Sequence, residues 1–185
     1  MNSKLLKHSL FAGFGLLLIP SISLFAQACP TIQIIENFGC VNSQLYRGEQ
    51  PTEQGIKELA RLGVKTIINL RNSEDWIAKE SAWASKEGIK MHSIPFPNWF
   101  APDAERISKA LALLNDSSLY PIYVHCKRGA DRTGTLILAY RVTHDGWTAD
   151  RAKLESKDYH FGWWQIWMRR FIGRYSKEHR KIPAD

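Results

Sequence analysis

Residues 122–134 read IYVHCKRGADRTG, and this stretch decides the fold that we expect. Its first residues form an apolar β-type run, and the apolar residues that follow it, Thr135–Val142, indicate a helix. A chain that turns sharply from a buried strand into a helix directs successive backbone N–H groups to one side. The start of the helix adds unpaired N–H groups and the positive end of a dipole. The stretch therefore predicts an anion-binding loop between a strand and a helix.

Three residues define the chemistry of this loop. Gly129 allows backbone torsions that a side chain forbids, and the planar guanidinium of Arg132 matches two phosphate oxygens. Cys126 lies where N–H groups and a cation favour the thiolate over the thiol. The alternative is an inert buried cysteine, with Arg132 in a surface ion pair. Because the turn, the helix start, the cysteine and the arginine agree, we favour a nucleophile beneath a phosphate site.

Strands and helices alternate along the chain, which is typical of βαβ units around a mostly parallel sheet. We expect an α/β fold whose central sheet has about four to five strands flanked by helices. The expected strands are 45–48, 64–70, 89–94 and 122–125, with one short strand within 31–40. The first expected helix begins at Pro51-Thr52 and ends at Gly63, and the second begins at Asn72 or Ser73 and ends at Gly88. The other expected helices are Asp103 to Leu114, 133–145, 148–157 and 163–180.

The first 28 residues predict a secretory signal peptide. Lys4 and Lys7 form a positive start, residues 10–19 are apolar, and Ala26-Gln27-Ala28 resembles a cleavage site. The alternative, a membrane anchor, needs ~20 apolar residues, and this stretch is shorter. We therefore divide the chain into a signal peptide at 1–28, an N-terminal extension at 29–44 and one domain at 45–182.

Export predicts a periplasmic protein in an oxidising compartment. Cys29 and Cys40 either form a disulfide or stay free, and their spacing does not separate the two. Lipid attachment at Cys29 is the weaker alternative, because Gln27 fits a lipoprotein signal poorly. The signal segment holds two lysines of a chain whose formal charge is +7. No Cys/His cluster has zinc-finger spacing, so we expect no metal site and no cofactor.

The motif His125-Cys126-x5-Arg132-Thr133-Gly134 resembles the phosphate-binding loop of cysteine-dependent protein tyrosine and dual-specificity phosphatases. Residues 45–51, LYRGEQP, and 63–71, GVKTIINLR, resemble the opening of the compact bacterial and fungal dual-specificity-like branch. Residues 139–147 are similar to exported bacterial members. The resemblance covers about residues 45–160 and implies a protein-tyrosine-phosphatase-like fold.

The resemblance also implies a two-step hydrolysis of phosphomonoesters without a metal ion. Cys126 attacks phosphorus and forms a phosphocysteine, while Arg132 and the loop N–H groups stabilise the equatorial oxygens. Thr133 occupies the position whose hydroxyl stabilises the departing thiolate, and His125 supports the cysteine. The phosphate-binding residues are then Lys127, Arg128, Gly129, Ala130, Asp131 and Arg132.

The general acid has two candidates. Relatives often carry an aspartate near the position of Asn98-Trp99, and neither of these side chains can protonate a leaving oxygen. Asp103 is the nearest carboxylate, and it fits the role of acid and the role of helix N-cap equally well. Asp131 lies inside the loop and is the acid in some bacterial relatives, while its structural alternative is a salt bridge on the rim.

Lys127 and Arg128 make the mouth of the loop positive and favour anionic substrates. We expect phosphotyrosine in proteins, with phosphoserine or phosphothreonine as further substrates. The alternatives are phosphoinositides or soluble inositol phosphates, and a weak phosphate-binding module that lacks the usual acid. Arg132-Thr133 disfavours a rhodanese-type sulfur transferase. No elongated basic face with interleaved aromatic residues indicates nucleic-acid binding. We expect a monomer.

The C-terminal segment combines aromatic and basic residues. On a helix the apolar side chains fall on one half, while Arg169, Arg170 and Lys177 fall opposite. We favour a helix that packs on the core with its basic side solvated. The alternative is an interfacial helix on an anionic membrane. The apolar residues are Phe161, Trp163, Trp164, Trp167, Met168, Phe171, Ile172 and Tyr175.

Overall fold

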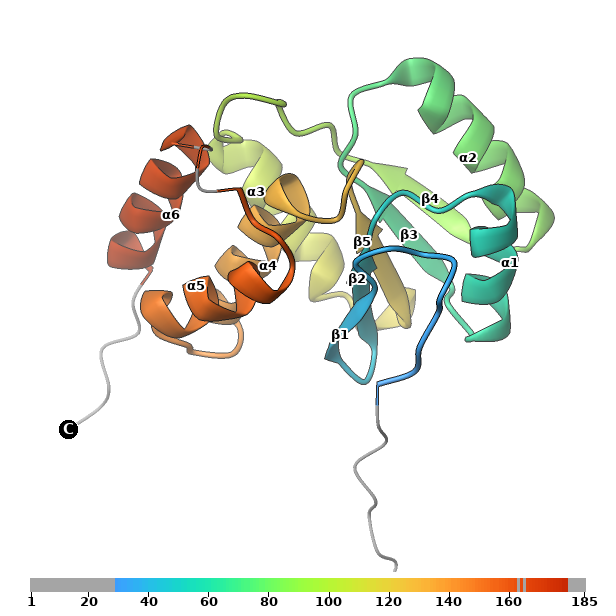
Figure 1. Cartoon of the computed structure of the whole chain (residues 1–185), viewed down its shortest axis with the longest axis horizontal. Helices are drawn as coiled ribbons and strands as arrows, with labels where there is room; N and C mark the ends of the chain where they lie inside the picture. Colours follow the sequence, from blue (N-terminus) through green and yellow to red (C-terminus); the bar gives the residue numbers. More distant parts are fainter. Residues whose placement is uncertain (1–28, 163, 165, 180–185) are drawn as a thin grey trace, which may run out of the picture.

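The computed structural model describes residues 29–162, 164 and 166–179 and centres on one five-stranded sheet (Figure 1). The strand order is β1-β2-β5-β3-β4. β5 pairs in parallel with β2 and β3, and β3 pairs in parallel with β4, whereas β1 and β2 are antiparallel. The α/β fold with a mostly parallel sheet is therefore confirmed. The strands are β1 Gly39–Asn42, β2 Leu45–Gly48, β3 Thr66–Asn69, β4 Lys90–Ser93 and β5 Ile122–His125.

The inner strands of the sheet are more buried than the edge strand β4. Every residue of β2, β3 and β5 is buried, because helices cover both faces of these inner strands. β4 lies at an edge and is partly exposed. The other edge strand, β1, comes from the segment that we separated as an N-terminal extension. The expected strand within 31–40 begins only at Gly39, and Ile35 before it is instead buried in a turn against the core.

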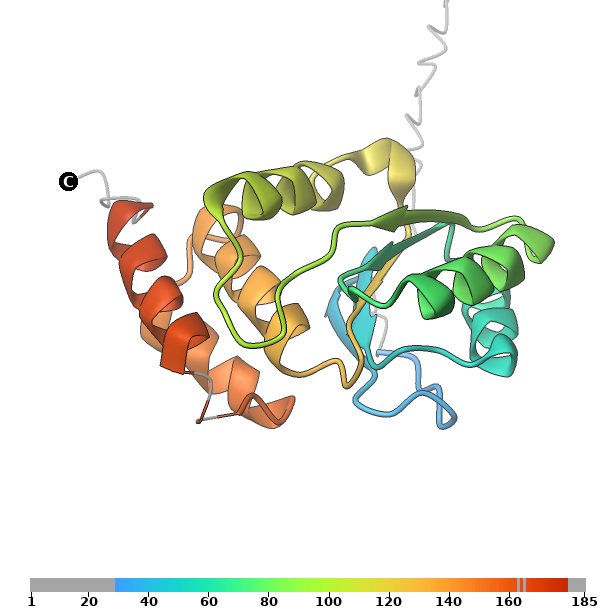
Figure 2. The same cartoon turned by 90° about the horizontal axis from the view of Figure 1, so that it is seen from above.

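Two helices cover one face of the sheet, α1 Glu53–Arg61 and α2 Glu74–Lys86 (Figures 1 and 2). The Thr52 side chain accepts a hydrogen bond from Gly55 N and caps α1. Gly63 and Gly88 follow the two helices with φ values of 87° and 71°. These positive values favour glycine and end both helices where the sequence predicts.

The other face carries four helices (Figure 2). α4 lies between the sheet and the outer pair α5 and α6, and its residues Asp131–Val142 are all buried. It begins two residues before the expected Thr133, so part of the predicted loop belongs to its first turn. A short 3₁₀ turn, Ser117–Leu119, precedes β5. The four helices are α3 Ala104–Leu114, α4 Asp131–Thr143, α5 Ala149–Asp158 and α6 Ile166–Glu178.

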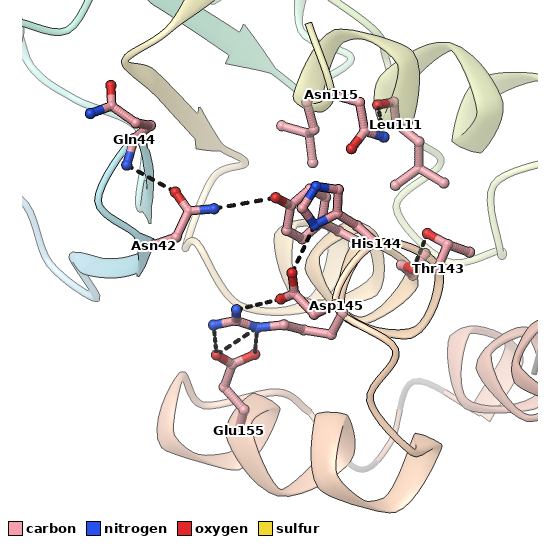
Figure 3. A network of polar contacts seen from close by, with 12 residues as sticks. Asn42, Gln44, Leu111, Asn115, Thr143, His144, Asp145 and Glu155 are labelled. Carbon is pink, nitrogen blue, oxygen red and sulfur yellow. Dashed lines mark hydrogen bonds and ion pairs between the residues drawn. The ribbon is translucent and has the colours of Figure 1, made fainter. Parts of the chain in front are cut away.

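A partly buried ion-pair network ties α4 to α5 (Figure 3). Arg141 of α4 donates from Nε to both carboxylate oxygens of Glu155 at 3.1 Å and from Nη1 to Asp145 at 2.7 Å. Burial lowers the pKa of Arg141, but these two acids outweigh it and raise the pKa overall. The guanidinium also lies 4.2 Å from the centre of the Trp147 ring. Residues 139–147 therefore stabilise the scaffold behind the loop.

The C-terminal aromatic residues divide between the core and the surface. Met168, Ile172 and Tyr175 of α6 are buried, as we expect for a packed helix. Trp164 and Trp167 remain 63% and 53% exposed. Trp163 lies outside the described residues, as does the predicted signal peptide at 1–28. Within the described part of the chain, no helix has the length and apolar character needed to cross a membrane.

Candidate active site

The predicted loop lies at the carboxyl ends of β2, β5 and β3, between β5 and α4. Gly129 has a φ of 66°, and a Cβ there would overlap the carbonyl group of Gly48 at the end of β2. Both the torsion and the close approach of the two chains require glycine at this position. On the other side, Leu70 N donates to His125 O at 2.9 Å and holds the end of β3 against the loop.

All five carbonyl groups of residues 126–130 are held by donors. In a trans peptide the C=O group and the N–H group of the next residue point in opposite directions. Loop carbonyls that bind donors outside the anion site therefore leave the N–H groups of the following residues pointing into it. No N–H of residues 127–130 has a backbone carbonyl as partner within the described part of the chain. This is the arrangement that the predicted anion nest requires. The five contacts are Cys126 O to His125 Nδ1 at 3.2 Å, Lys127 O to Gln50 N at 3.4 Å, Arg128 O to Asn37 Nδ2 at 3.1 Å, Gly129 O to Arg47 Nη2 at 2.9 Å and Ala130 O to Gly134 N at 2.6 Å.

Cys126 lies at the base of this nest and is 3% exposed. Burial raises the pKa of its thiol, but four contacts together outweigh burial and lower the pKa below its ordinary value. These contacts are with the Thr133 hydroxyl, the Arg132 charge and the backbone N–H groups of Thr133 and Arg128. These contacts stabilise the thiolate against the effect of burial, in the direction that the sequence predicts. Cys126 is the free cysteine, whereas Cys29 and Cys40 form a disulfide with their Cα atoms 5.7 Å apart.

Thr133 and Arg132 both belong to the first turn of α4. The Thr133 hydroxyl is buried and has no partner of standard hydrogen-bond geometry among the described residues. Its contact with the Cys126 sulfur is therefore looser than a normal hydrogen bond, yet it still stabilises the thiolate. Arg132 is buried, and Nη1 donates to Leu70 O at 3.4 Å. Within the described part of the chain, no closer acceptor competes with a phosphate for this side chain.

The two candidate acids occupy different surroundings. Asp131 is the first residue of α4, and its carboxylate accepts from Gly162 N at 2.7 Å and from Arg128 Nη2 at 2.5 Å. Asp103 caps α3, accepts from Arg106 N at 2.8 Å, and is 51% exposed. Each carboxylate thus makes the structural contact that we weighed against an acid role. Asn98 and Trp99 are exposed on the loop before α3.

Several site residues were not among our predictions. Arg47 is fully buried beneath the loop and lies 3.8 Å from the centre of the Tyr159 ring. Burial lowers its pKa to about 10. Arg71 donates to the Gln50 side chain, and burial together with repulsion from Arg132 lowers its pKa. Arg47 and Arg71 both lie in the segments that carry the resemblance, which was the one signal that could have found them.

Removal of the Thr133 hydroxyl tests the origin of the low thiol pKa. In Thr133→Val the thiolate loses one of its stabilising contacts, so the pKa of Cys126 should rise toward the ordinary ~8.5. The midpoint of iodoacetamide alkylation against pH measures this shift, and the rate near pH 6 should fall. Thr143→Val makes the same change at the other end of α4 and should leave the midpoint in place. An unchanged midpoint in Thr133→Val would rule out this contact.

Comparison with known proteins places this geometry in a family. Residues 30–166 match the family model described as DSP-PTPase phosphatase fused to NAD+ kinase. The dual specificity protein phosphatase TpbA of Pseudomonas aeruginosa is 30% identical over 144 residues, which cover 77% of this chain and 62% of that protein. A second TpbA sequence is covered over 52% of its length, so the chain spans about half to three-fifths of these relatives.

Solved structures agree with this placement. The core catalytic domain of SIW14 from S. cerevisiae, described as a PP-IP phosphatase, superimposes with a TM-score of 0.69 at 25% identity. The match covers 78% of this chain and 88% of that one. P. aeruginosa TpbA with bound phosphotyrosine has a TM-score of 0.65 at 23% identity, covering 82% and 94% of the two chains, and shows the same fold. The chain therefore belongs to the DSP-type protein tyrosine phosphatase family that the matching model describes.

Proposed function

We propose that this protein hydrolyses phosphomonoesters through a phosphocysteine intermediate. The observation that carries the proposal is a thiol of lowered pKa at the base of a loop whose five carbonyls are turned away. In the first step the Cys126 sulfur attacks phosphorus, the bond to the leaving oxygen breaks, and an acid protonates that oxygen. In the second step water attacks phosphorus, the S–P bond breaks, and the Thr133 hydroxyl stabilises the returning thiolate.

The loop supplies the electrostatic part of catalysis. A phosphoryl group in transfer spreads negative charge over three equatorial oxygens. Inward N–H groups and the Arg132 guanidinium occupy fixed positions around them, so little reorganisation is needed as the charge redistributes. Lys127 and Arg128, both exposed beside the loop, attract the anion before it binds.

We propose phosphotyrosine in proteins, with phosphoserine or phosphothreonine as further targets, as the substrate class. Two exposed tryptophans stand beside arginines of the site. Trp164 lies 5.7 Å from the Arg128 guanidinium, and Trp76 lies 5.6 Å from that of Arg71. Such rings can stack on the phenyl group of a phosphotyrosine. The name of TpbA, a dual specificity protein phosphatase, supports the same class.

A second candidate is an inositol phosphate or phosphoinositide. Arg71 lies close enough to Arg132 for their repulsion to lower its pKa, and its hydrogen-bond partner Gln50 is uncharged. A substrate with several phosphates would place a second anion against Arg71 and relieve this repulsion. The description of SIW14 as a PP-IP phosphatase favours the same candidate. The kcat/KM for a phosphotyrosine peptide, compared with the kcat/KM for an inositol polyphosphate, shows which of the two substrate classes the protein prefers.

Hydrolysis of p-nitrophenyl phosphate tests the proposed reaction directly. We expect measurable turnover by the reduced protein and a loss of at least about a thousandfold in Cys126→Ser, because the weaker serine nucleophile stays protonated. Thr143→Val, at the far end of α4, is the matched control and should keep full activity. If the folded, reduced native protein shows no turnover, the chain is a phosphate-binding module.

The acid is identified from pH profiles on phenyl phosphate, whose leaving group needs protonation. A general acid works only while protonated, so kcat falls as the pH rises through its pKa. Asp103→Asn keeps a good N-cap and Asp131→Asn keeps the acceptor for Gly162 N, so both variants should fold. We expect one of them alone to lose this alkaline limb and about 10²–10⁴-fold in kcat. Unchanged profiles in both would exclude both aspartates.

We also propose that the protein is exported to the periplasm and acts there as a monomer. The pattern of residues 1–28 and the Cys29–Cys40 disulfide support export, since disulfides persist in oxidising compartments. The disulfide occupies the Cys29 thiol that a lipid anchor would need. Sequencing of the N-terminus of the periplasmic protein checks cleavage after Ala28, and sedimentation velocity checks the monomer.

Contact with an anionic membrane is a further proposal. Phe100 lies 6.4 Å from Trp167 between ring centres, and both rings are more than half exposed. Arg170, Arg174 and Lys177 line the same depression on α6. Exposed aromatic rings beside cations suit an anionic lipid interface.

Sedimentation with anionic vesicles tests this contact. We expect the protein to bind phosphatidylglycerol vesicles and the exchange of Trp164 and Trp167 for serine to remove most of the binding, because these rings would insert at the interface. Trp76→Ser changes an exposed tryptophan on α2 and should leave binding intact. Equal or negligible binding by all three proteins would exclude the membrane contact.

A further inference from the structure

Glu80 is a fully buried carboxylate that the proposed chemistry does not use. It is one of two buried residues of α2, whose remaining residues are partly or fully exposed. A charged group in the core is costly unless polar partners compensate it, and Glu80 has three. Oε1 lies 2.6 Å from His125 Nε2, and Oε2 accepts from Gln50 Nε2 at 3.0 Å and from Asn69 Nδ2 at 3.2 Å.

Both ring nitrogens of His125 have a polar partner. Its Nδ1 faces the Cys126 carbonyl oxygen, which can only accept, so Nδ1 donates in this contact. Its Nε2 faces the Glu80 carboxylate oxygen Oε1 at 2.6 Å. The ring is therefore held from two sides, by Glu80 and by the Cys126 carbonyl.

Glu80 reaches the loop by two routes. Through His125 it holds the Cys126 carbonyl, and through the Gln50 side chain it fixes the residue whose backbone N–H holds the Lys127 carbonyl. These are two of the five carbonyls whose outward direction leaves the loop N–H groups facing inward. A third contact, with Asn69, steadies the side chain that accepts from Arg71 N at 2.7 Å.

We propose that Glu80 is a positioning residue for the phosphate loop. It orients the Cys126–Lys127 and Lys127–Arg128 peptides through His125 and Gln50, so that their N–H groups face the bound phosphate and the Cys126 sulfur. The inference rests on the proposed role of Cys126 as nucleophile. A merely structural Glu80 would change the stability of the fold and leave the thiol and the phosphate site unaltered.

Three variants separate the two roles. Glu80→Ala removes the support of His125 and Gln50. Glu80→Gln can restore it, because the amide oxygen accepts from Gln50 and Asn69 while the amide N–H donates to a His125 that keeps its hydrogen on Nδ1. Glu87→Ala removes an exposed carboxylate at the end of the same helix and is the matched control. Glu80→Ala and Glu80→Gln both remove the carboxylate charge, so a difference in thiol pKa between these two variants reports orientation.

For Glu80→Ala we expect a higher pH midpoint of Cys126 alkylation, weaker inhibition by inorganic phosphate, and a loss of about ten- to a hundredfold in kcat/KM. Glu80→Gln should recover most of each value, and Glu87→Ala should match the native protein. Thermal unfolding of each variant confirms that the measured protein is folded. If Glu80→Ala does not fold, Glu80→Asp draws the carboxylate back by one methylene and should shift the same readouts in the same direction.

Two results would overturn the proposal. One is a folded Glu80→Ala, or Glu80→Asp in its place, with the native alkylation midpoint and phosphate inhibition. The other is a Glu80→Gln as impaired as Glu80→Ala, which would mean that orientation through hydrogen bonds is not what Glu80 supplies. Alkylation needs no turnover, so it tests Glu80 even if the native protein proves inactive on every phosphomonoester. For that case the binding of inorganic phosphate, measured by calorimetry, replaces its inhibition constant.

Discussion

The outward direction of five consecutive carbonyl groups is the constraint on which this site depends. A loop between a strand and a helix binds an anion when its N–H groups converge on one point. Each peptide then directs its carbonyl away from that point, where the carbonyl oxygen needs a hydrogen-bond donor. Here the donors are a histidine ring, an asparagine amide, an arginine and two backbone N–H groups. The convergent N–H groups, with Thr133 and Arg132, then lower the pKa of a buried thiol that burial alone would raise.

The rest of the fold supplies these donors. β5 lies in the middle of the sheet, so strands on both sides of it can deliver residues to the loop at its carboxyl end. β2 brings Arg47 and leads to Gln50, while β3 carries Asn69 and ends beside Arg71. α4 is buried along its length and places Arg132 and Thr133, and its Arg141 network connects it to α5. The positions of the functional side chains thus follow from strand order and from the packing of one central helix.

Several polar residues around the loop are buried, and their burial explains why they hold one arrangement. Arg47, Glu80 and His125 are charged or polar side chains in the core, and each interacts with a loop carbonyl or with a group that does. Polar groups at such depth are tolerated when their hydrogen bonds are made, and they hold one arrangement because few others satisfy them. Glu80 holds the His125 ring, and that ring in turn holds the Cys126 carbonyl.

The local features of this protein can be predicted from its amino-acid sequence alone. The alternation of strands and helices, the glycines that end α1 and α2, and the loop with its cysteine, arginine and threonine all depend on neighbouring residues, and the structure agrees with them. The antiparallel pairing and the later start of β1, and the earlier start of α4, differ from the expectation, because pairing partners and the first helical turn depend on contacts outside the local pattern.

The contacts that hold the loop open are long-range and arise only when the chain is folded. Asn37, Arg47 and Glu80 reach it across 91, 82 and 45 residues of chain. Their separation leaves no periodicity or spacing that links them to Cys126. An asparagine in a turn, an arginine in a strand and a glutamate on a helix look like ordinary surface residues in the sequence. The fold brings Asn37 to the loop and buries Arg47 and Glu80 beside it. The proposed nucleophile was therefore readable from local sequence, whereas its support came from long-range packing.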